Sequence, residues 1–338
     1  MENYCEASCM KITYYVHDLA FPLVEGIRKQ AWWMALSMKH RGYEVEIVST
    51  SKKKEVIEKE GITIRYGSAV DISNVKTDIL HYLSHPSPLI VPLLMRAKAK
   101  KQVMTIFGGN LHGFWKRSWD RVVSRLVRKN VSLVMVQTKF QRELLKSTRL
   151  EKLPVTVLPP LIPQVHRTTY PSERASLLFM SHLSPFKGVD EVLRAFVVLR
   201  RKFKNLQLVI CDSGLVSNEY TEKIERVNQR DIILKGKVDP IEELSKAWVY
   251  LYPIRQVQET FSVPLSFIES IQVGTPYVGS SIGGIPEYFH KDHLVEPRDV
   301  PSLVRKIEHL LRFKSVEPVQ KLMVNSETIR RLIDIYVA

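Results

Sequence analysis

The sequence predicts an α/β protein built from two doubly wound domains, each with a parallel β-sheet between layers of helices. Short apolar segments typical of strands alternate along the chain with segments whose apolar residues recur at helical spacing. The chain has 338 residues, which is long for a single hydrophobic core. A proline-rich stretch at residues 159–163 divides it into two parts of ordinary domain size.

The first part contains several strand–helix pairs. A strand is expected over residues 12–16, a helix over residues 27–38 that Gly42 ends, and a second strand over residues 43–49. Further strands are expected over residues 62–66, 79–83, 103–107, 133–137 and 155–158, and helices over residues 114–129 and from residue 138. Strands that alternate with helices in this way favour a parallel sheet.

The second part repeats this alternation. Strands are expected over residues 177–181, 206–211, 232–234, 249–252 and 277–278. Helices are expected after residue 189, over residues 242–246, before Gly274, from residue 301, and over residues 319–336. We therefore predict one domain over residues 1–165, a second over residues 166–316, and a helix within residues 317–338 that crosses back onto the first domain.

A glycine pair marks a candidate ligand loop in the second domain. Gly283 and Gly284 follow a short strand and precede Ile285-Pro286-Glu287, where a proline and an acid suit a first helical turn. Glycines at such a place let the backbone approach a ligand and direct N–H groups at it. An ordinary βαβ unit without a ligand is the alternative.

Two carboxylates precede this loop. Glu269 lies on the expected helix, and Glu259 lies in the loop before it. Because these acids and the glycine loop all lie near strand ends, they suit a polyhydroxylated, anionic ligand.

This region resembles the C-terminal half of the retaining family 4 glycosyltransferases of the GT-B fold. Glu269, the Gly274-Thr275-Pro276 turn and the Gly283–Glu287 loop match the family pattern closely. Glu259 precedes Glu269 by ten positions, which is longer than the family spacing. The resemblance implies that Glu269 hydrogen-bonds the ribose hydroxyls of a nucleotide-sugar donor. It also implies that Glu259 contacts the sugar of this donor.

A second match lies at the start of the second domain. Residues 181–188 resemble the family element Gly-Arg-Leu-x-x-x-Lys-Gly, whose arginine and lysine hold the donor diphosphate. Lys187 and Gly188 are present, whereas His182 occupies the arginine position. A histidine binds a diphosphate less well than a guanidinium group, so Lys187 is the stronger candidate.

The resemblance is looser in the first domain. Of the family's first glycine loop only Gly26 remains. Many relatives carry a histidine directly after the strand that ends here at Phe107, whereas His112 comes several residues later. His112 is either a catalytic group reaching the site from its loop or a solvated loop histidine.

The resemblance implies two Rossmann-like domains that face each other across a cleft. It also implies a retaining transfer of a sugar from a nucleotide-diphosphate-sugar donor to an acceptor glycan or a lipid-linked acceptor. No cofactor is expected, and no metal, since the chain lacks an Asp-x-Asp motif. The alternatives are a GT-B sugar-nucleotide epimerase, and a non-catalytic basic protein with a degenerate donor site.

The charge of the chain indicates a further partner. The formal net charge is +15, and residues 114–129 combine cations and tryptophans in an amphipathic pattern. This predicts docking on an anionic membrane surface; a domain helix with a solvated basic face is the alternative. No nucleic-acid motif accompanies the charge, so nucleic acid is not expected. Three cysteines without a disulfide pattern and the lack of a signal segment predict a cytoplasmic protein, peripheral on the inner face of the membrane.

Overall fold

A computed structural model describes most of the chain. The described residues are 10–23, 25–108, 119–162, 165–169, 171–181, 183–212, 220, 222, 224, 230–257, 263–313 and 325–338. The chain divides into two compact units, which we call unit 1 (Met1–Leu161 and Met323–Ala338) and unit 2 (Ile162–Leu322). The sequence placed the first boundary after residue 165, within the linker that follows unit 1.

Unit 1 is built on an eight-stranded sheet with the order β3-β4-β2-β1-β5-β6-β7-β8. Its strands are β1 (Lys11–His17), β2 (Glu44–Thr50), β3 (Glu55–Lys59), β4 (Ile62–Gly67), β5 (Lys76–Leu83), β6 (Lys98–Ile106), β7 (Leu133–Val136) and β8 (Val155–Val157). All neighbouring strands are parallel except β3 and β4, which are antiparallel.

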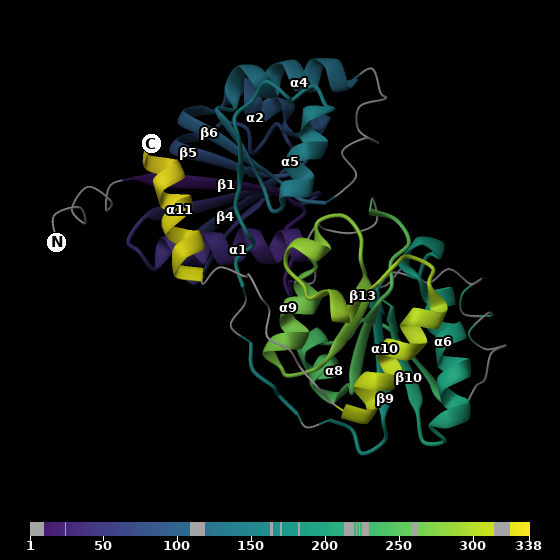
Figure 1. The fold of residues 1–338 in the computed structure, drawn as a ribbon. Coiled ribbons are helices and arrows are strands. Elements are labelled where there is room, and N and C mark those ends of the chain that lie inside the picture. Colours follow the sequence, from purple (N-terminus) through teal and green to yellow (C-terminus); the bar gives the residue numbers. More distant parts are fainter. Residues whose placement is uncertain are drawn as a thin grey trace. The chain divides into compact units, whose positions relative to one another are not determined.

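Helices cover both faces of this sheet (Figure 1). The helices α2 (Val91–Arg96), α4 (Trp119–Asn130) and α5 (Lys139–Lys146) lie on one face, and α1 (Gly26–Lys39) and α11 (Asn325–Val337) lie on the other. A short 3-10 turn, η2 (Pro88–Ile90), leads into α2. Thr138 begins α5 as predicted, because its hydroxyl accepts a hydrogen bond from the Gln141 N–H group.

Side chains that alternate along the strands of unit 1 point to opposite faces of its sheet, so each face has its own buried side chains. Tyr15 and Tyr82 belong to the apolar core that includes residues of α2, α4 and α5. Tyr14 and His81 face the other way, as successive residues of a strand do. They meet Tyr336 of α11: its hydroxyl oxygen lies 2.6 Å from Nδ1 of His81 and donates to the Tyr14 hydroxyl at 3.1 Å. A buried polar cluster thus attaches α11 to β1 and β5.

Unit 2 is built on a six-stranded sheet with the order β11-β10-β9-β12-β13-β14, and all of its pairs are parallel. Its strands are β9 (Ser176–Ser181), β10 (Gln207–Asp212), β11 (Ile232–Lys235), β12 (Val249–Tyr252), β13 (Tyr277–Ser280) and β14 (Leu294–Val295). Its helices are α6 (Val189–Lys202), α8 (Pro240–Lys246), α9 (Leu265–Gln272) and α10 (Val300–Phe313), and its 3-10 turns are η3 (Pro185–Lys187), η5 (Ile285–Glu287) and η6 (Lys291–His293).

The sheet of unit 2 also buries both faces. Leu177 and Phe179 pack with the apolar residues of α6 and α10, and Leu178 packs with those of α8 and α9. Figure 1 shows the two helix pairs on opposite sides of the strands. This arrangement explains why the inner strands are continuous apolar runs, since their residues are buried on both faces, whereas the edge strand β11 exposes Ile233 and Leu234.

The predicted α/β fold with two parallel sheets is therefore confirmed. The sequence did not predict β3, which consists largely of exposed charged residues, or β14, which has only two residues. Among the described residues, no helix is both long and apolar enough to cross a bilayer.

Candidate functional site

The strand order of unit 2 points to one edge of its sheet. From β9 the chain moves outward to β10 and β11, and it then returns to the other side of β9 for β12 and β13. The order therefore reverses between β9 and β12. In open parallel sheets, ligands bind beyond the carboxyl ends of the strands at such a switch point. The loops that follow β9 and β12 form this place in unit 2.

The loop after β9 carries Lys187 and has a conformation that requires glycine. The turn η3 ends at Lys187, and Gly188 then adopts a left-handed conformation with φ of 83° as the N-cap of α6. A Cβ atom on Gly188 would lie 1.9 Å from the carbonyl oxygen of Pro253, which follows β12. The two loops are thus in direct contact, and only glycine permits it.

Arg255 holds the same two loops together by its polar groups. Its backbone N–H donates to the Phe186 carbonyl oxygen at 2.8 Å. Its Nε donates to the two carboxylate oxygens of Glu191 at 2.8 and 3.0 Å, and its Nη2 donates to Asp190 Oδ2 at 2.9 Å. Burial opposes the charge of the guanidinium group, but the bonds to Glu191 and Asp190 outweigh it and raise the pKa of Arg255.

Glu269 lies on α9 and is 2% exposed. Its neighbour Tyr250 on β12 donates from its hydroxyl to Ser266 Oγ of the same helix at 2.9 Å. Burial raises the pKa of Tyr250, and the charge of Glu269 contributes to this increase. The residue predicted to bind the ribose of the donor is therefore an almost fully buried carboxylate close to Tyr250.

The glycine loop after β13 is a tight turn. Gly283 has a positive φ of 61°, which explains a glycine there without a ligand, whereas Gly284 has an ordinary φ of −87°. The expected helix start at residues 285–287 is instead the short 3-10 turn η5. A helical turn therefore begins where it was predicted, but it is a 3-10 turn in which Glu287 N–H bonds to the Gly284 carbonyl three residues back, and the helix does not continue.

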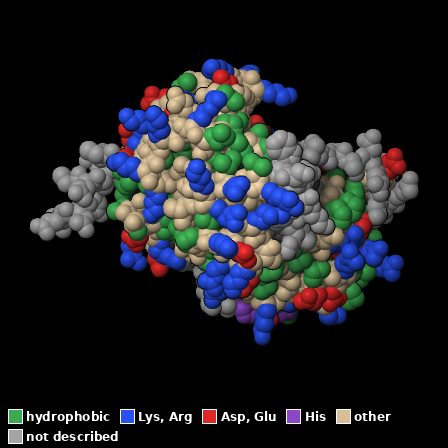
Figure 2. Space-filling view, turned by 90° about the horizontal axis from the view of Figure 1, so that it is seen from above, with side chains coloured by type: hydrophobic (Ala, Val, Ile, Leu, Met, Phe, Trp, Pro, Cys, Tyr) green, Lys and Arg blue, Asp and Glu red, His purple; other side chains and the backbone are tan. Residues whose placement is uncertain are grey.

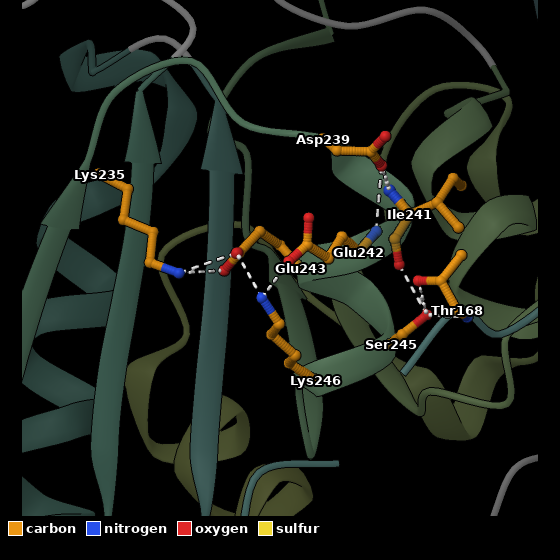
Figure 3. Close-up of polar contacts among 8 residues, drawn as sticks. All are labelled: Thr168, Lys235, Asp239, Ile241, Glu242, Glu243, Ser245 and Lys246. Atoms are coloured by element: carbon orange, nitrogen blue, oxygen red, sulfur yellow. Dashed lines mark hydrogen bonds and ion pairs between the residues drawn. The ribbon is translucent and has the colours of Figure 1, made fainter. Parts of the chain in front are cut away.

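A charged cluster supports the loop after β11 (Figure 3). Lys235, the last residue of β11, donates to both carboxylate oxygens of the buried Glu243 on α8, at 2.8 and 2.7 Å. Asp239 caps α8 by accepting hydrogen bonds from the N–H groups of Ile241 and Glu242 at 2.8 and 3.1 Å. These bonds fix the path of the chain between β11 and α8.

Two further groups lie at the end of β10. Burial, with a contribution from Glu243, raises the pKa of the Cys211 thiol to about 12, so this thiol stays protonated and is a poor nucleophile. Asp212 is 1% exposed, and neither of its carboxylate oxygens has a hydrogen-bond partner among the described residues. A buried carboxylate without a donor is costly, which makes Asp212 a candidate acceptor for a ligand.

The structure assigns the predicted site residues to different places. Lys187, Gly283 and Gly284 lie in loops beyond the carboxyl ends of unit 2 strands, and Glu269 lies on α9. Gly26 is the first residue of α1 in unit 1. His112, His182 and Glu259 lie outside the described residues. The sequence analysis did not single out Arg255 or Asp212, and the only available signal was that each comes shortly after the end of an expected strand.

Comparison with known proteins identifies this unit. Residues 165–324 match the family profile described as "Glycosyl transferases group 1". Unit 2 therefore matches this family over nearly all of its length, and the chain has the GT-B fold with two Rossmann-like units.

One curated relative is similar to this chain over two thirds of its length. The relative is a "GDP-mannose-dependent alpha-(1-6)-phosphatidylinositol monomannoside mannosyltransferase" of Mycolicibacterium smegmatis. It is 25% identical over 254 residues, which are 67% of this chain and 65% of that protein, slightly under two thirds of its length.

The solved structures share the fold at low sequence identity. Sucrose-phosphate synthase from Thermosynechococcus elongatus has a TM-score of 0.74 at 14% identity and covers 97% of this chain and 98% of its own. Anabaena HepE in complex with UDP-glucose has a TM-score of 0.74 at 12% identity and covers 97% of this chain and 99% of its own.

Proposed function

We propose that this chain is a retaining glycosyltransferase that moves a sugar from a nucleotide-diphosphate-sugar donor to an acceptor. One observation carries the proposal. The loop with Lys187 lies at the switch point of a unit that matches the group 1 family profile. The relative that depends on GDP-mannose and the neighbour bound to UDP-glucose support a donor of this class.

The residues of unit 2 suit the charge that such a reaction develops. When the sugar leaves, negative charge accumulates on the diphosphate, and a cation placed there stabilises the transition state. Lys187 is our candidate for this cation. Asp212 and the turn at Gly283–Gly284 would contact the nucleotide, and Glu269 would orient its ribose. Glu259 and His112 remain our candidates for the donor sugar and the acceptor side, and no metal or cofactor enters this proposal.

Calorimetric titration with nucleotides tests the proposal. We expect UDP or GDP to bind with a dissociation constant well below that of the matching monophosphate, because the diphosphate makes the additional contact with Lys187. The nucleotide that binds should also raise the melting temperature, since a ligand that binds only the folded state stabilises it. If no nucleoside diphosphate binds, the proposal is wrong.

Product analysis separates this function from the two alternatives. A transferase releases a nucleoside diphosphate only as sugar appears on an acceptor, whereas an epimerase changes the sugar nucleotide without an acceptor. A non-catalytic protein does neither. NMR of the product decides whether the anomeric configuration of the donor is retained.

We further propose that unit 1 docks on an anionic membrane surface, which suits a lipid-linked acceptor and a cytoplasmic, peripheral enzyme. The described part of the predicted basic segment is α4, which exposes four cations, Arg121, Arg125, Arg128 and Lys129, together with Val122. Val123 and Val127 on its other side are buried in the core of unit 1. Figure 2 shows Lys and Arg side chains gathered on the face of the molecule seen from above.

A basic pocket adjoins this surface. It has a volume of about 550 Å³ and lies where α4 and α5 end, and its lining consists of Arg128, Lys146, Ser147, Thr148, Arg149, Glu151 and Lys152. Lys146 is paired with Glu143 at 2.6 Å. The side chains of Arg128, Arg149 and Lys152 make no ion pair within the described part of the chain. An anionic lipid headgroup would neutralise this local excess of positive charge.

Vesicle co-sedimentation tests the docking. Each cation near an anionic leaflet contributes about 1 kcal/mol, and salt screens this attraction. We expect the protein to pellet with phosphatidylserine-containing vesicles at low salt, and much less at high salt or with neutral vesicles. Changing Arg121, Arg125 and Arg128 to Glu should abolish pelleting.

The control makes the same change of charge elsewhere. Arg194, Arg201 and Lys204 are exposed cations of unit 2, on or next to α6, and changing these three to Glu should leave pelleting nearly unchanged. Equal losses in the two triple variants would show that only net charge matters. In that case α4 is a solvated basic face, and a soluble acceptor becomes the better hypothesis.

A further inference from the structure

We propose that Arg255 is a positioning residue that holds Lys187 in place for the donor diphosphate. This inference rests on the function proposed above. It concerns a residue that neither makes a predicted ligand contact nor lies in a motif that the sequence analysis used. Its evidence is the set of contacts between the loops that follow β9 and β12.

Arg255 fixes the Lys187 loop from both sides of that residue. On the N-terminal side, its backbone N–H holds the carbonyl of Phe186 at 2.8 Å. On the C-terminal side, its guanidinium group holds Glu191 and Asp190, which form the first turn of α6. Lys187 lies between these two anchors, so the path of its backbone depends on Arg255.

The guanidinium pairing is well protected from water. The side chains are 17% exposed for Arg255, 13% for Asp190 and 5% for Glu191. Charge-assisted hydrogen bonds in such surroundings are stronger and more directional than exposed ones. Only an arginine presents Nε and Nη2 in one plane to two separate carboxylates, so a lysine would keep the charge without the geometry.

Placement of Lys187 matters more in this chain than in the family pattern. His182 stands where the pattern has an arginine, so the fork that would grip the diphosphate in two directions is missing. A lysine is a point charge on a flexible stem, and its effect depends on where its backbone is anchored. Arg255 supplies that anchor from the neighbouring strand end.

Three variants separate position from charge. Arg255→Gln removes the guanidinium anchor and leaves two acids uncompensated, while the backbone bond to Phe186 stays in place. Arg255→Lys keeps the charge but loses the planar pairing. The triple variant Arg255→Gln, Asp190→Asn, Glu191→Gln has no guanidinium anchor and no uncompensated acid. For each protein we would titrate the nucleoside diphosphate that binds the wild type, and measure kcat and the donor and acceptor KM.

We expect Arg255→Gln to weaken diphosphate binding about tenfold, as the loss of one well-placed charged contact does. The donor KM should rise by a similar factor while the acceptor KM is unchanged. Arg255→Lys should lie between the wild type and Arg255→Gln. The triple variant should stay as weak as Arg255→Gln, and recovery to wild-type affinity would show that Arg255 only neutralises charge.

Arg200→Gln is the matched control. Arg200 is a part-buried arginine near the C-terminal end of α6, the end opposite to the Lys187 loop, and its Nε lies 2.8 Å from Asp231 Oδ2. It should lower the melting temperature about as much as Arg255→Gln without changing nucleotide affinity. If the wild type binds a nucleoside diphosphate, and both Arg255→Gln and Arg255→Lys bind it as tightly as the wild type does, this inference is wrong although the proposed function stands. If the wild type binds none, the proposed function fails.

Discussion

Single residues at the switch point of unit 2 have separable roles. Gly188 permits the contact between two loops, Arg255 ties those loops together, and Lys187 carries the charge at the end of η3. Only Lys187 is proposed to touch the donor. Removing its ammonium group should therefore change binding more than folding.

Lys187→Ala is expected to weaken nucleoside diphosphate binding at least about tenfold, or ~1.4 kcal/mol, with little change in melting temperature. Lys187 is only half-buried, so its side chain contributes little to the core. Calorimetric titration and thermal unfolding measure the two quantities. Lys204→Ala, which removes an exposed cation just beyond α6, is the control and should change neither. Unchanged affinity in Lys187→Ala would make this residue an ordinary surface lysine.

Glu269 requires a more conservative change, because its side chain is almost fully buried. Glu269→Gln keeps the volume of the side chain, so we expect only a small loss of stability. Because it removes the carboxylate, we expect at least a tenfold loss of transfer rate. Glu269→Ala should also lower the free energy of unfolding, by about 1–3 kcal/mol, since it leaves a cavity in the scaffold. Glu259→Ala should have a smaller effect on transfer than either. Near-wild-type transfer in Glu269→Gln would remove Glu269 from the donor site.

At the scale of elements, the sequence predicts what depends on local pattern. Residues 249–252 were predicted as a strand, and β12 has those bounds because its run of valine, leucine and tyrosine is buried on both faces. The charged segment of β3 carries no such signal, because that strand is added to the sheet edge by antiparallel pairing with β4. The bond between Arg255 and Glu191 joins residues 64 positions apart, and no local pattern reports it. The sequence indicated Lys187 as a site residue only through the resemblance of residues 181–188 to a family motif.

The buried histidine between β5 and α11 makes the free energy of unfolding depend on pH. Burial lowers the pKa of His81 to about 3, from an ordinary value of 6.5. The unfolded chain therefore binds a proton that the folded chain rejects, and stability that is present above pH 6.5 is lost as the pH falls toward 3. His81→Gln cannot titrate in this way.

Urea unfolding at pH 6 and pH 5 tests this dependence. Between these values the free energy of unfolding should fall more in the wild type than in His81→Gln, by up to about 1.4 kcal/mol. This range lies above the ordinary pKa of most carboxyl groups. His85, whose pKa burial lowers to about 4, is present in both proteins and cancels in the comparison. Equal slopes would contradict the assignment of this effect to His81.

At the scale of the whole molecule, unit 1 is discontinuous in sequence. Residues 325–338 belong to it, although all of unit 2 lies between them and residue 161. Besides the Tyr336 contacts, Lys101 Nζ on β6 donates to the Ile335 carbonyl at 2.5 Å, and Arg331 Nη2 donates to the Val157 carbonyl at 3.1 Å. The helix α11 therefore spans the sheet from β1 to β8.

Deleting residues 325–338 should loosen unit 1 and spare unit 2. Hydrogen exchange followed by mass spectrometry can distinguish them, since amides of β1 and β5 should exchange much faster and amides of β9 and β12 should not. Calorimetric nucleotide affinity should be retained, because the proposed donor residues of unit 2 are intact. Unchanged exchange in β1 and β5 would show that α11 contributes little to unit 1.

The discontinuity of unit 1 also governs how the chain is assembled during synthesis. A ribosome completes all of residues 162–322 before it makes α11, so the first sheet waits with Tyr14 and His81 uncovered while the second unit emerges. Domains generally fold as units during synthesis, and the N-terminal one usually folds first. Here that order is reversed: unit 2 is the first to have its full sequence. The time needed to make residues 162–322 therefore determines how long the face of unit 1 that α11 covers is exposed to chaperones and to other chains.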